Sequence, residues 1–109
     1  MTMLGRIQVP PSVRKGEVFE VRVLVQHPME TGFRRDMSGA TIPVNVVDKL
    51  TCRIGGREVF SAVLGTGIAA NPYLVFTAVA DASGNVEVEW SDDRGDKGVT
   101  SAPLVVVPA

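Results

Sequence analysis

Apolar and polar residues alternate most clearly over residues 17–27, EVFEVRVLVQH. One side of this run carries Phe19, Val21, Val23 and Val25. A period of two residues over this length predicts a half-buried antiparallel strand. His27 ends the run in phase with the apolar side, so we expect its ring to face the core.

The same alternation recurs in VEVEW at 86–90, where two valines and Trp90 face one side and two glutamates the other. Turn residues at 82–85 precede this run, so residues 73–92 are predicted to form a hairpin. A second hairpin is predicted to join residues 50–54 to 57–64 through Gly55-Gly56, because glycine tolerates positive φ.

The remaining segments are shorter and less regular. Residues 5–9 and 103–107 read as the first and last strands, 91–98 as a polar loop, and 44–50 as the one candidate for a short helix. Strands at regular spacing with Gly and Pro turns predict an all-β fold, an immunoglobulin-like antiparallel β-sandwich of about seven strands. The length of 109 residues suits a single domain over 1–109.

Two strands depart from one-sided alternation. In residues 73–80, Tyr73 and Val75 lie on one face while Leu74 and Phe76 lie on the other, and residues 103–107 are also apolar on both faces. A strand in a two-layer sandwich normally has one solvated face. Two explanations are open, a loop of the same chain over the outer face or a partner chain covering it.

Composition and charge argue against nucleic-acid binding and against a membrane span. The formal net charge is -1 with a pI near 5.7, so no basic field is present for nucleic acid. The apolar runs are too short for a membrane span. The N-terminal residues show no apolar signal region, so the chain is cytoplasmic, has lost a signal, or is exported with another chain.

The chain has few residues that could act in catalysis or bind a metal. A structural zinc site needs about four ligands, and the chain has one histidine and one cysteine. Cys52 shares a parity with Leu50 and Ile54, which favours an inert core thiol over a nucleophile. The aspartates in SDDRGDKG are more typical of a solvated acidic turn than of a calcium site. We therefore expect no catalytic residue, metal or cofactor.

Residues 26–36, QHPMETGFRRD, form the most unusual segment. Pro28 ends strand pairing directly after His27, because proline has no N–H to donate. Met29, Phe33, Arg34 and Arg35 then lie in a loop, and these residue types are enriched in the cores of protein interfaces. The segment either folds over its own sandwich or is a recognition loop. We favour the recognition loop, with His27 anchoring it by hydrogen bonds.

The chain also resembles the SoxZ family, the Z subunit of the SoxYZ carrier complex of thiosulfate oxidation. The resembling segments are VRKGEVFEV at 13–21, QHPMETGFRRD at 26–36, the LTCRIGGREVF region, IAANPYLVF at 68–76 and EVEWSDDRG. They span nearly the whole chain, and the segments at 26–36 and 68–76 are specific together.

This resemblance implies a non-catalytic subunit of a periplasmic sulfur carrier complex. Its partner would be a Y subunit, which holds sulfur intermediates on a cysteine within a flexible C-terminal Gly-Gly-Cys-Gly-Gly arm. Sox enzymes would contact the complex transiently, and the chain would be exported with its partner. We place the partner interface at His27, Met29, Phe33, Arg34, Arg35, Tyr73, Val75 and Phe76. The alternatives are an interaction module for another secreted or periplasmic partner, and a small hydrolase or redox protein using His27 or Cys52.

Overall fold

The computed structural model describes residues 4–65 and 67–109, which form nine β-strands. Their bounds are β1 Gly5–Gln8, β2 Val13–Arg14, β3 Val18–Val25, β4 Val47–Ile54, β5 Arg57–Val63, β6 Tyr73–Val79, β7 Gly84–Asp92, β8 Lys97–Leu104 and β9 Val106–Val107. Neither range contains a helix that is long and apolar enough to cross a bilayer.

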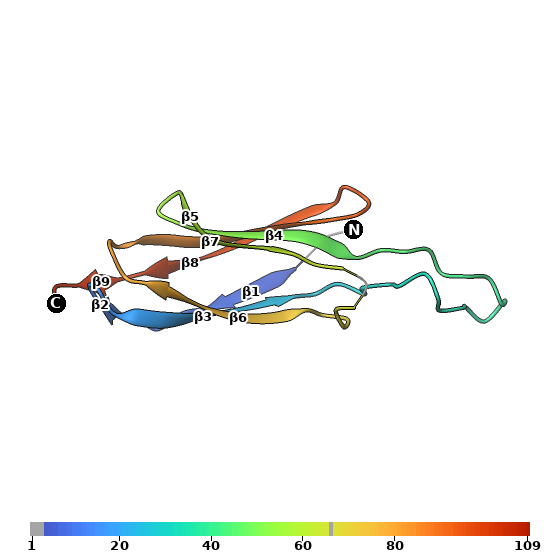
Figure 1. Ribbon diagram of the computed structural model, residues 1–109, viewed down its shortest axis with the longest axis horizontal. Coiled ribbons are helices and arrows are strands. Elements are labelled where there is room, and N and C mark those ends of the chain that lie inside the picture. Colours follow the sequence, from blue (N-terminus) through green and yellow to red (C-terminus); the bar gives the residue numbers. More distant parts are fainter. Residues whose placement is uncertain (1–3, 66) are drawn as a thin grey trace.

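Two antiparallel sheets form the body of the molecule. One has the strand order β1-β3-β6 and the other β5-β4-β7-β8, while β2 and β9 form a short parallel pair. Figure 1 shows the sheets stacked face to face, with the β2–β9 pair at one end and a long loop extending from the other. The molecule measures 60 × 19 × 19 Å, and this loop accounts for much of its length. The expected all-β sandwich is confirmed.

The core lies between the sheets and follows the alternation in the sequence. Phe19, Val21, Val23 and Val25 of β3 are buried, as are Val86, Val88 and Trp90 of β7. The inward-facing residues Phe60 of β5 and Phe76 of β6 stack with centroids 4.0 Å apart and ring planes 5° apart. This pair lies where the two sheets meet at one lateral side of the sandwich.

Trp90 defines the opposite lateral side. A Cβ added to Gly5 or to Gly98 would lie 2.4 Å from an atom of the indole ring. Glycine is therefore required on both β1 and β8, because the backbone of each strand lies against the ring. These two strands contact each other across the sandwich and close this side.

The hairpin through Gly55-Gly56 is confirmed. Ile54 pairs with Arg57, and the two glycines have φ of 59° and 82°. Positive φ at both central residues is the requirement of a type I′ turn, which matches the twist of two adjacent strands.

The predicted hairpin over residues 73–92 is wrong. β6 pairs with β3, whereas β7 pairs with β4 and β8, so the chain crosses from one sheet to the other between them. The backbone N–H of Ala80 donates to Glu17 O at 2.9 Å, so β3 pairing continues past the end of β6. Ser83 Oγ then accepts a hydrogen bond from Val106 N–H at 2.7 Å, which fixes the crossing segment to β9.

Two further expectations are corrected. Residues 44–50 form no helix; β4 begins at Val47 as a central strand, and a register shift between Val47 and Lys49 interrupts the alternation at its start. Short apolar runs of this kind do not distinguish buried strand from helix. The loop predicted at 91–98 is only residues 93–96, because β7 continues to Asp92 and β8 begins at Lys97.

Candidate functional site

His27 lies two residues after the end of β3 and is buried, as its parity predicts. Its Nδ1 accepts a hydrogen bond from the Met29 backbone N–H at 3.0 Å. Its own backbone N–H donates to Asn71 Oδ1 at 3.0 Å, and Asn71 N–H donates to His27 O at 2.8 Å. His27 therefore holds the start of the long loop against the segment that precedes β6.

The second ring nitrogen of His27 meets the last residue of β7. Nε2 lies 3.3 Å from Asp92 Oδ2, and both side chains are almost fully buried. Because Nδ1 accepts from a backbone N–H, the neutral ring carries its proton on Nε2 and donates it to Asp92. Asp92 Oδ1 in turn accepts from the N–H groups of Arg94 and Asp96, each at 2.9 Å.

The buried His27–Asp92 pair has a structural role. A histidine and an aspartate in contact suggest general-base chemistry, but a general base needs a ring nitrogen free to meet a substrate. Here both ring nitrogens of His27 and both carboxylate oxygens of Asp92 have partners inside the protein. The pair ties three segments together: the residues after β3, the end of β7 and the turn before β8.

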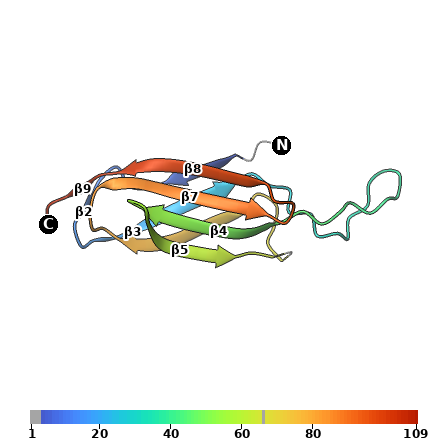
Figure 2. The same cartoon turned by 90° about the horizontal axis from the view of Figure 1, so that it is seen from above.

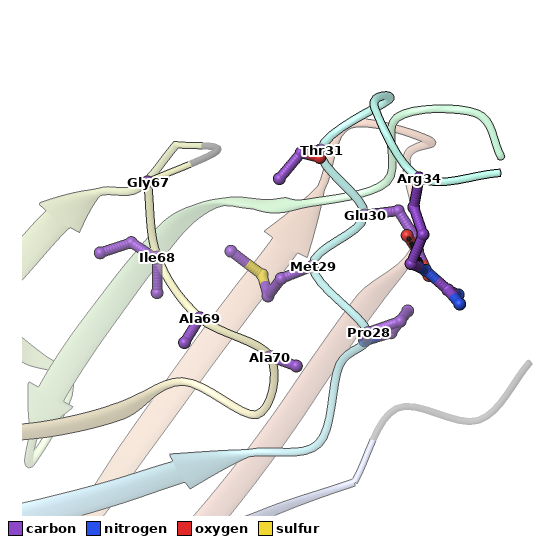
Figure 3. Close-up of a pocket in the computed structure, with 9 residues that line it drawn as sticks. All are labelled: Pro28, Met29, Glu30, Thr31, Arg34, Gly67, Ile68, Ala69 and Ala70. Atoms are coloured by element: carbon purple, nitrogen blue, oxygen red, sulfur yellow. Dashed lines mark hydrogen bonds and ion pairs between the residues drawn. The ribbon is translucent and has the colours of Figure 1, made fainter. Parts of the chain in front are cut away.

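Met29 is buried, so it does not present the apolar surface we expected from the sequence. Its φ of 51° is in the left-handed region, which non-glycine residues seldom adopt. Its Sδ accepts a hydrogen bond from Val47 N–H at 3.2 Å. In Figure 3 its side chain lies beside Ile68 and Ala69, in a pocket of roughly 600 Å³ at the base of the loop.

Residues 30–45 continue outward as a narrow two-stranded arm, which we call the arm. Glu30 pairs with Asn45 at its base, and Arg35 pairs with Thr41 near its tip. Asp36 N–H donates to Ala40 O at 2.9 Å, which closes the tip. The arm is a hydrogen-bonded ribbon that projects from one end of the sandwich (Figures 1 and 2).

The two arginines of the arm make internal contacts. Arg34 forms a two-point ion pair with Glu30, with Nε donating to Oε2 at 3.1 Å. The Arg34 guanidinium lowers the pKa of the Glu30 carboxyl, and the carboxylate raises the pKa of Arg34. Arg35 Nη1 donates to Gly39 O at 2.9 Å. Both guanidinium groups are thus held in fixed positions, while the Arg34 side chain stays largely exposed.

Apolar side chains on the arm face solvent. Phe33 is 88% exposed, Met37 is fully exposed, and Val44 is also exposed. An isolated exposed apolar residue is ordinary, but several on a projecting ribbon of 16 residues suggest a surface that another molecule covers. Phe33 was predicted from the sequence, whereas Met37 and Val44 were not, because they lie outside residues 26–36.

The outer face of the β1-β3-β6 sheet is the second apolar surface. The outward residues of β6 are Tyr73, Val75, Thr77 and Val79, and Val79 is paired with the exposed Val18 of β3. The charges on this face belong to Arg6, Glu20 and Arg22, and the last two form an ion pair at 3.1 Å. We call the surface made by Val18, Leu24, Tyr73, Val75 and Val79 the apolar face.

The outer face of the other sheet is different. It carries charged residues on all four strands, including Glu58 of β5, Lys49 and Arg53 of β4, Glu87 and Glu89 of β7, and Lys97 of β8. Arg53 and Glu87 form an ion pair at 3.6 Å. This is closer to the solvated face expected of a lone sandwich, because its exposed valines, Val63 of β5 and Val99 of β8, lie on opposite edge strands with the charges of β4 and β7 between them.

Two explanations were open for the strand at 73–80, which is apolar on both faces. Among the described residues, no loop of the chain covers its outer face. Val75 points outward and is 49% exposed, whereas Phe76 points inward and packs on Phe60. Of the residues predicted for the partner interface, Phe33, Arg34, Arg35, Tyr73 and Val75 are accessible, whereas His27, Met29 and Phe76 are buried.

Cys52 is fully buried in β4. Burial raises the pKa of its thiol to about 11, so the reactive thiolate is scarce at neutral pH. Residues 4–65 and 67–109 contain no group of three or more His, Cys, Asp and Glu side chains able to hold a metal ion. Asp92 and Asp93 instead accept backbone hydrogen bonds, Asp93 Oδ1 from Val46 N–H at 2.8 Å.

Comparison with known proteins gives a family and a fold. A family model described as sulphur oxidation protein SoxZ matches residues 7–103. Two structures of a superoxide reductase (neelaredoxin) from Ignicoccus hospitalis align with TM-scores of 0.71 and 0.73 at 17% and 18% identity. The alignments cover 94% and 97% of this chain, and 79% and 82% of the other.

A CARDB domain from Pyrococcus furiosus aligns with a TM-score of 0.50 at 14% identity, covering 94% of each chain. At these identities the structures show a common sandwich fold alone. A search of curated proteins found no match.

Proposed function

The chain belongs to the SoxZ family of sulphur oxidation proteins, and we propose that it is the non-catalytic subunit of a periplasmic sulfur carrier complex. Membership makes it a subunit of a Sox system that oxidises sulfur compounds. In the proposal it pairs with a Y subunit, whose C-terminal cysteine holds the sulfur intermediate, and both are exported together.

The apolar face is the observation that carries the pairing. Tyr73, Val75 and Val79 are exposed on one sheet, while the opposite sheet presents charges. Covering apolar surface is favourable by roughly 25 cal/mol per Å² before the costs of association are subtracted. Residues 73–80 are apolar on both faces, and the described chain covers only the inner one. A partner bound to the apolar face would cover the outer one.

The chemistry of the candidate catalytic groups supports a non-catalytic role. His27 and Asp92 use their polar atoms to hold loops together, and Cys52 is a buried thiol with a raised pKa. A labile sulfur adduct must reach several enzymes in turn, so it is best carried on a flexible tail. A rigid sandwich is suited to presenting such a tail from a partner.

The arm extends the proposal to a second contact. Phe33 offers an exposed ring, and Arg34 and Arg35 are held by internal contacts with their positions fixed. A preorganised arginine near an aromatic side chain is a common anchor in protein interfaces. The Y subunit is our first choice for the arm's partner, and a transiently docking Sox enzyme is the second.

Co-expression with a Y-type subunit tests this function. The wild-type chain should copurify with a subunit that ends in a flexible Gly-Gly-Cys-Gly-Gly tail. Val75→Asp should reduce the yield of this complex, because it places a charge in the apolar face. Val63→Asp, at an exposed valine on the charged sheet, is the matched control and should not. Separate elution of the two wild-type chains would contradict the proposal.

A further inference from the structure

β6 is an edge strand whose free side is unusually open. It pairs only with β3 among the described residues, and its seven residues, YLVFTAV, contain no charge and no proline. Proteins normally protect long edges with charged residues, proline, bulges or short strands, because free N–H and C=O groups recruit another strand. β6 has none of these protections.

The other three edges of the two sheets are protected. β1 has only four residues, β5 carries Arg57 and Glu58, and β8 carries Lys97 and Pro103. In addition, β1 and β8 contact each other at their side of the sandwich. The lack of protection is therefore specific to β6 within residues 4–65 and 67–109.

The register identifies which backbone groups are free. Pro72 O accepts from Val25 N–H and Ala80 N–H donates to Glu17 O, so both residues face β3. In a regular antiparallel strand the N–H and C=O of one residue point to the same side, and successive residues alternate. No register shift interrupts the β3–β6 pairing. The N–H and C=O groups of Tyr73, Val75, Thr77 and Val79 therefore point to the free edge.

A hollow next to this edge offers space for added chain. It has a volume of roughly 900 Å³ and lies between β5 and the end of β6. Its lining includes Ile54, Ala78, Ala80 and Leu104, which are apolar, with Arg57 and Glu58 of β5 also contributing. Lys15 and Asp81 also line it, so side chains that alternate from an added strand into this hollow would meet both apolar and charged groups.

We propose that β6 is a β-augmentation site, where an extended segment of the partner subunit adds as a strand and continues the β1-β3-β6 sheet. The inference rests on the proposed function for the existence of that partner. The segment it fits is rich in β-branched or aromatic residues, because side chains opposite Val75 and Val79 would pack on those valines. The partner strand would bond to Tyr73, Val75, Thr77 and Val79 and widen the apolar face.

Amide hydrogen exchange followed by NMR on the labelled chain reads this geometry directly. In the isolated chain the amides of Leu74, Phe76 and Ala78 should be protected, and those of Tyr73, Val75, Thr77 and Val79 should exchange rapidly. Adding a Y-type subunit should protect the second set as well. Continued rapid exchange of the second set in a formed complex would overturn the inference.

Thr77→Pro supplies an independent test. Its N–H points to the free edge, so proline there should leave the isolated chain folded while removing a donor to the added strand. We expect the affinity for the Y-type subunit to fall about ten- to hundredfold. Thr77→Ser, which keeps the N–H, should change it by less than about threefold.

The outcomes separate this inference from the proposed function. A wild-type complex that is weakened by Val75→Asp but tolerates Thr77→Pro means docking through side chains alone, which overturns β-augmentation and keeps the pairing. Absence of any wild-type complex overturns both. Concentration-dependent protection of the four amides without a partner would assign the edge to a second copy of this chain and overturn the inference.

Discussion

His27 and Asp92 lie 65 positions apart in the sequence, and their side chains meet in the interior with Nε2 and Oδ2 3.3 Å apart. The contact joins the residues after β3 to the end of β7, which belong to opposite sheets. It fixes the root of the arm relative to the sandwich. This contact acts together with the Met29–Val47 and Val46–Asp93 hydrogen bonds, which also fix the position of the arm.

Breaking this contact should cost stability and leave the chemistry intact. His27→Gln removes the ring that joins Met29 N–H to Asp92, so we expect the free energy of unfolding to fall by about 1–3 kcal/mol. Urea unfolding measures the loss. A reconstituted Sox system should still turn over thiosulfate, and an abolished turnover with an intact complex would identify His27 as catalytic.

Asp92→Asn tests the direction of the hydrogen bonds. Its amide oxygen can still accept from Arg94 and Asp96, but its NH₂ would face the proton on His27 Nε2. Moving that proton to Nδ1 would conflict with Met29 N–H. We expect the free energy of unfolding to fall by about 1–3 kcal/mol. In the double variant of His27→Gln and Asp92→Asn, the loss should be smaller than the sum of the two single losses. Additive losses in the cycle would show that the two side chains act independently.

The alternation of apolar and polar residues predicted much of the sandwich but not the contact between His27 and Asp92. The strict alternation of β3 and β7 identified their buried faces, because a period of two is imposed by the strand itself. Asp92 has the parity of Val86, Val88 and Trp90, which is the one signal that could have placed it inside. Its pairing with His27 depends on how the sheets stack, which local pattern does not report.

The failed predictions have a similar origin. Turn residues at 82–85 are present, but the same residue types serve a hairpin and a crossing between sheets. The last strand was predicted only at residues 103–107, because Val99 is the one strongly apolar residue of KGVTSAPL before Leu104. Its place beside β7 is decided by backbone pairing, and its small Gly98 is required by the Trp90 ring.

Val75 and Phe76 are adjacent in sequence and should behave in opposite ways. Phe76→Ala removes a ring stacked on Phe60, so we expect a loss of about 3–5 kcal/mol in the free energy of unfolding. Val75→Asp should change the unfolding midpoint little and weaken association with the Y-type subunit. Chemical denaturation and a binding titration on the same samples separate the two effects. Equal destabilisation by both variants would contradict the outward placement of Val75.

The arm should contribute to binding without contributing to stability. Phe33→Ala and Met37→Ala remove exposed side chains, so unfolding should change by less than about 0.5 kcal/mol. If Arg34 is desolvated in the complex, Arg34→Ala should weaken association by roughly 2–5 kcal/mol, whereas an arginine at the rim would mainly alter the on-rate and its salt dependence. Surface plasmon resonance at two salt concentrations distinguishes these results. Unchanged binding to both the Y subunit and the Sox enzymes would remove the arm from the interface.

Cys52 should react slowly with thiol reagents, and its titration should lower the stability only at high pH. Because burial raises its pKa from 9.0 to about 11, the folded state holds the thiol proton more tightly than the unfolded state. This contribution is present below pH 9.0 and is lost as pH rises towards about 11. Wild type should therefore lose more stability over this window than Cys52→Ala, as thermal unfolding would show. An equal loss in both proteins would contradict the buried-thiol assignment.

The distribution of sulfur within the complex tests the proposed role most directly. Mass spectrometry of both subunits during thiosulfate turnover should find the sulfur adduct on the C-terminal cysteine of the Y-type subunit, and this chain at its unmodified mass. Cys52→Ala should leave both masses and the turnover rate otherwise unchanged. A sulfur adduct on Cys52 that disappears together with turnover in Cys52→Ala would contradict the account.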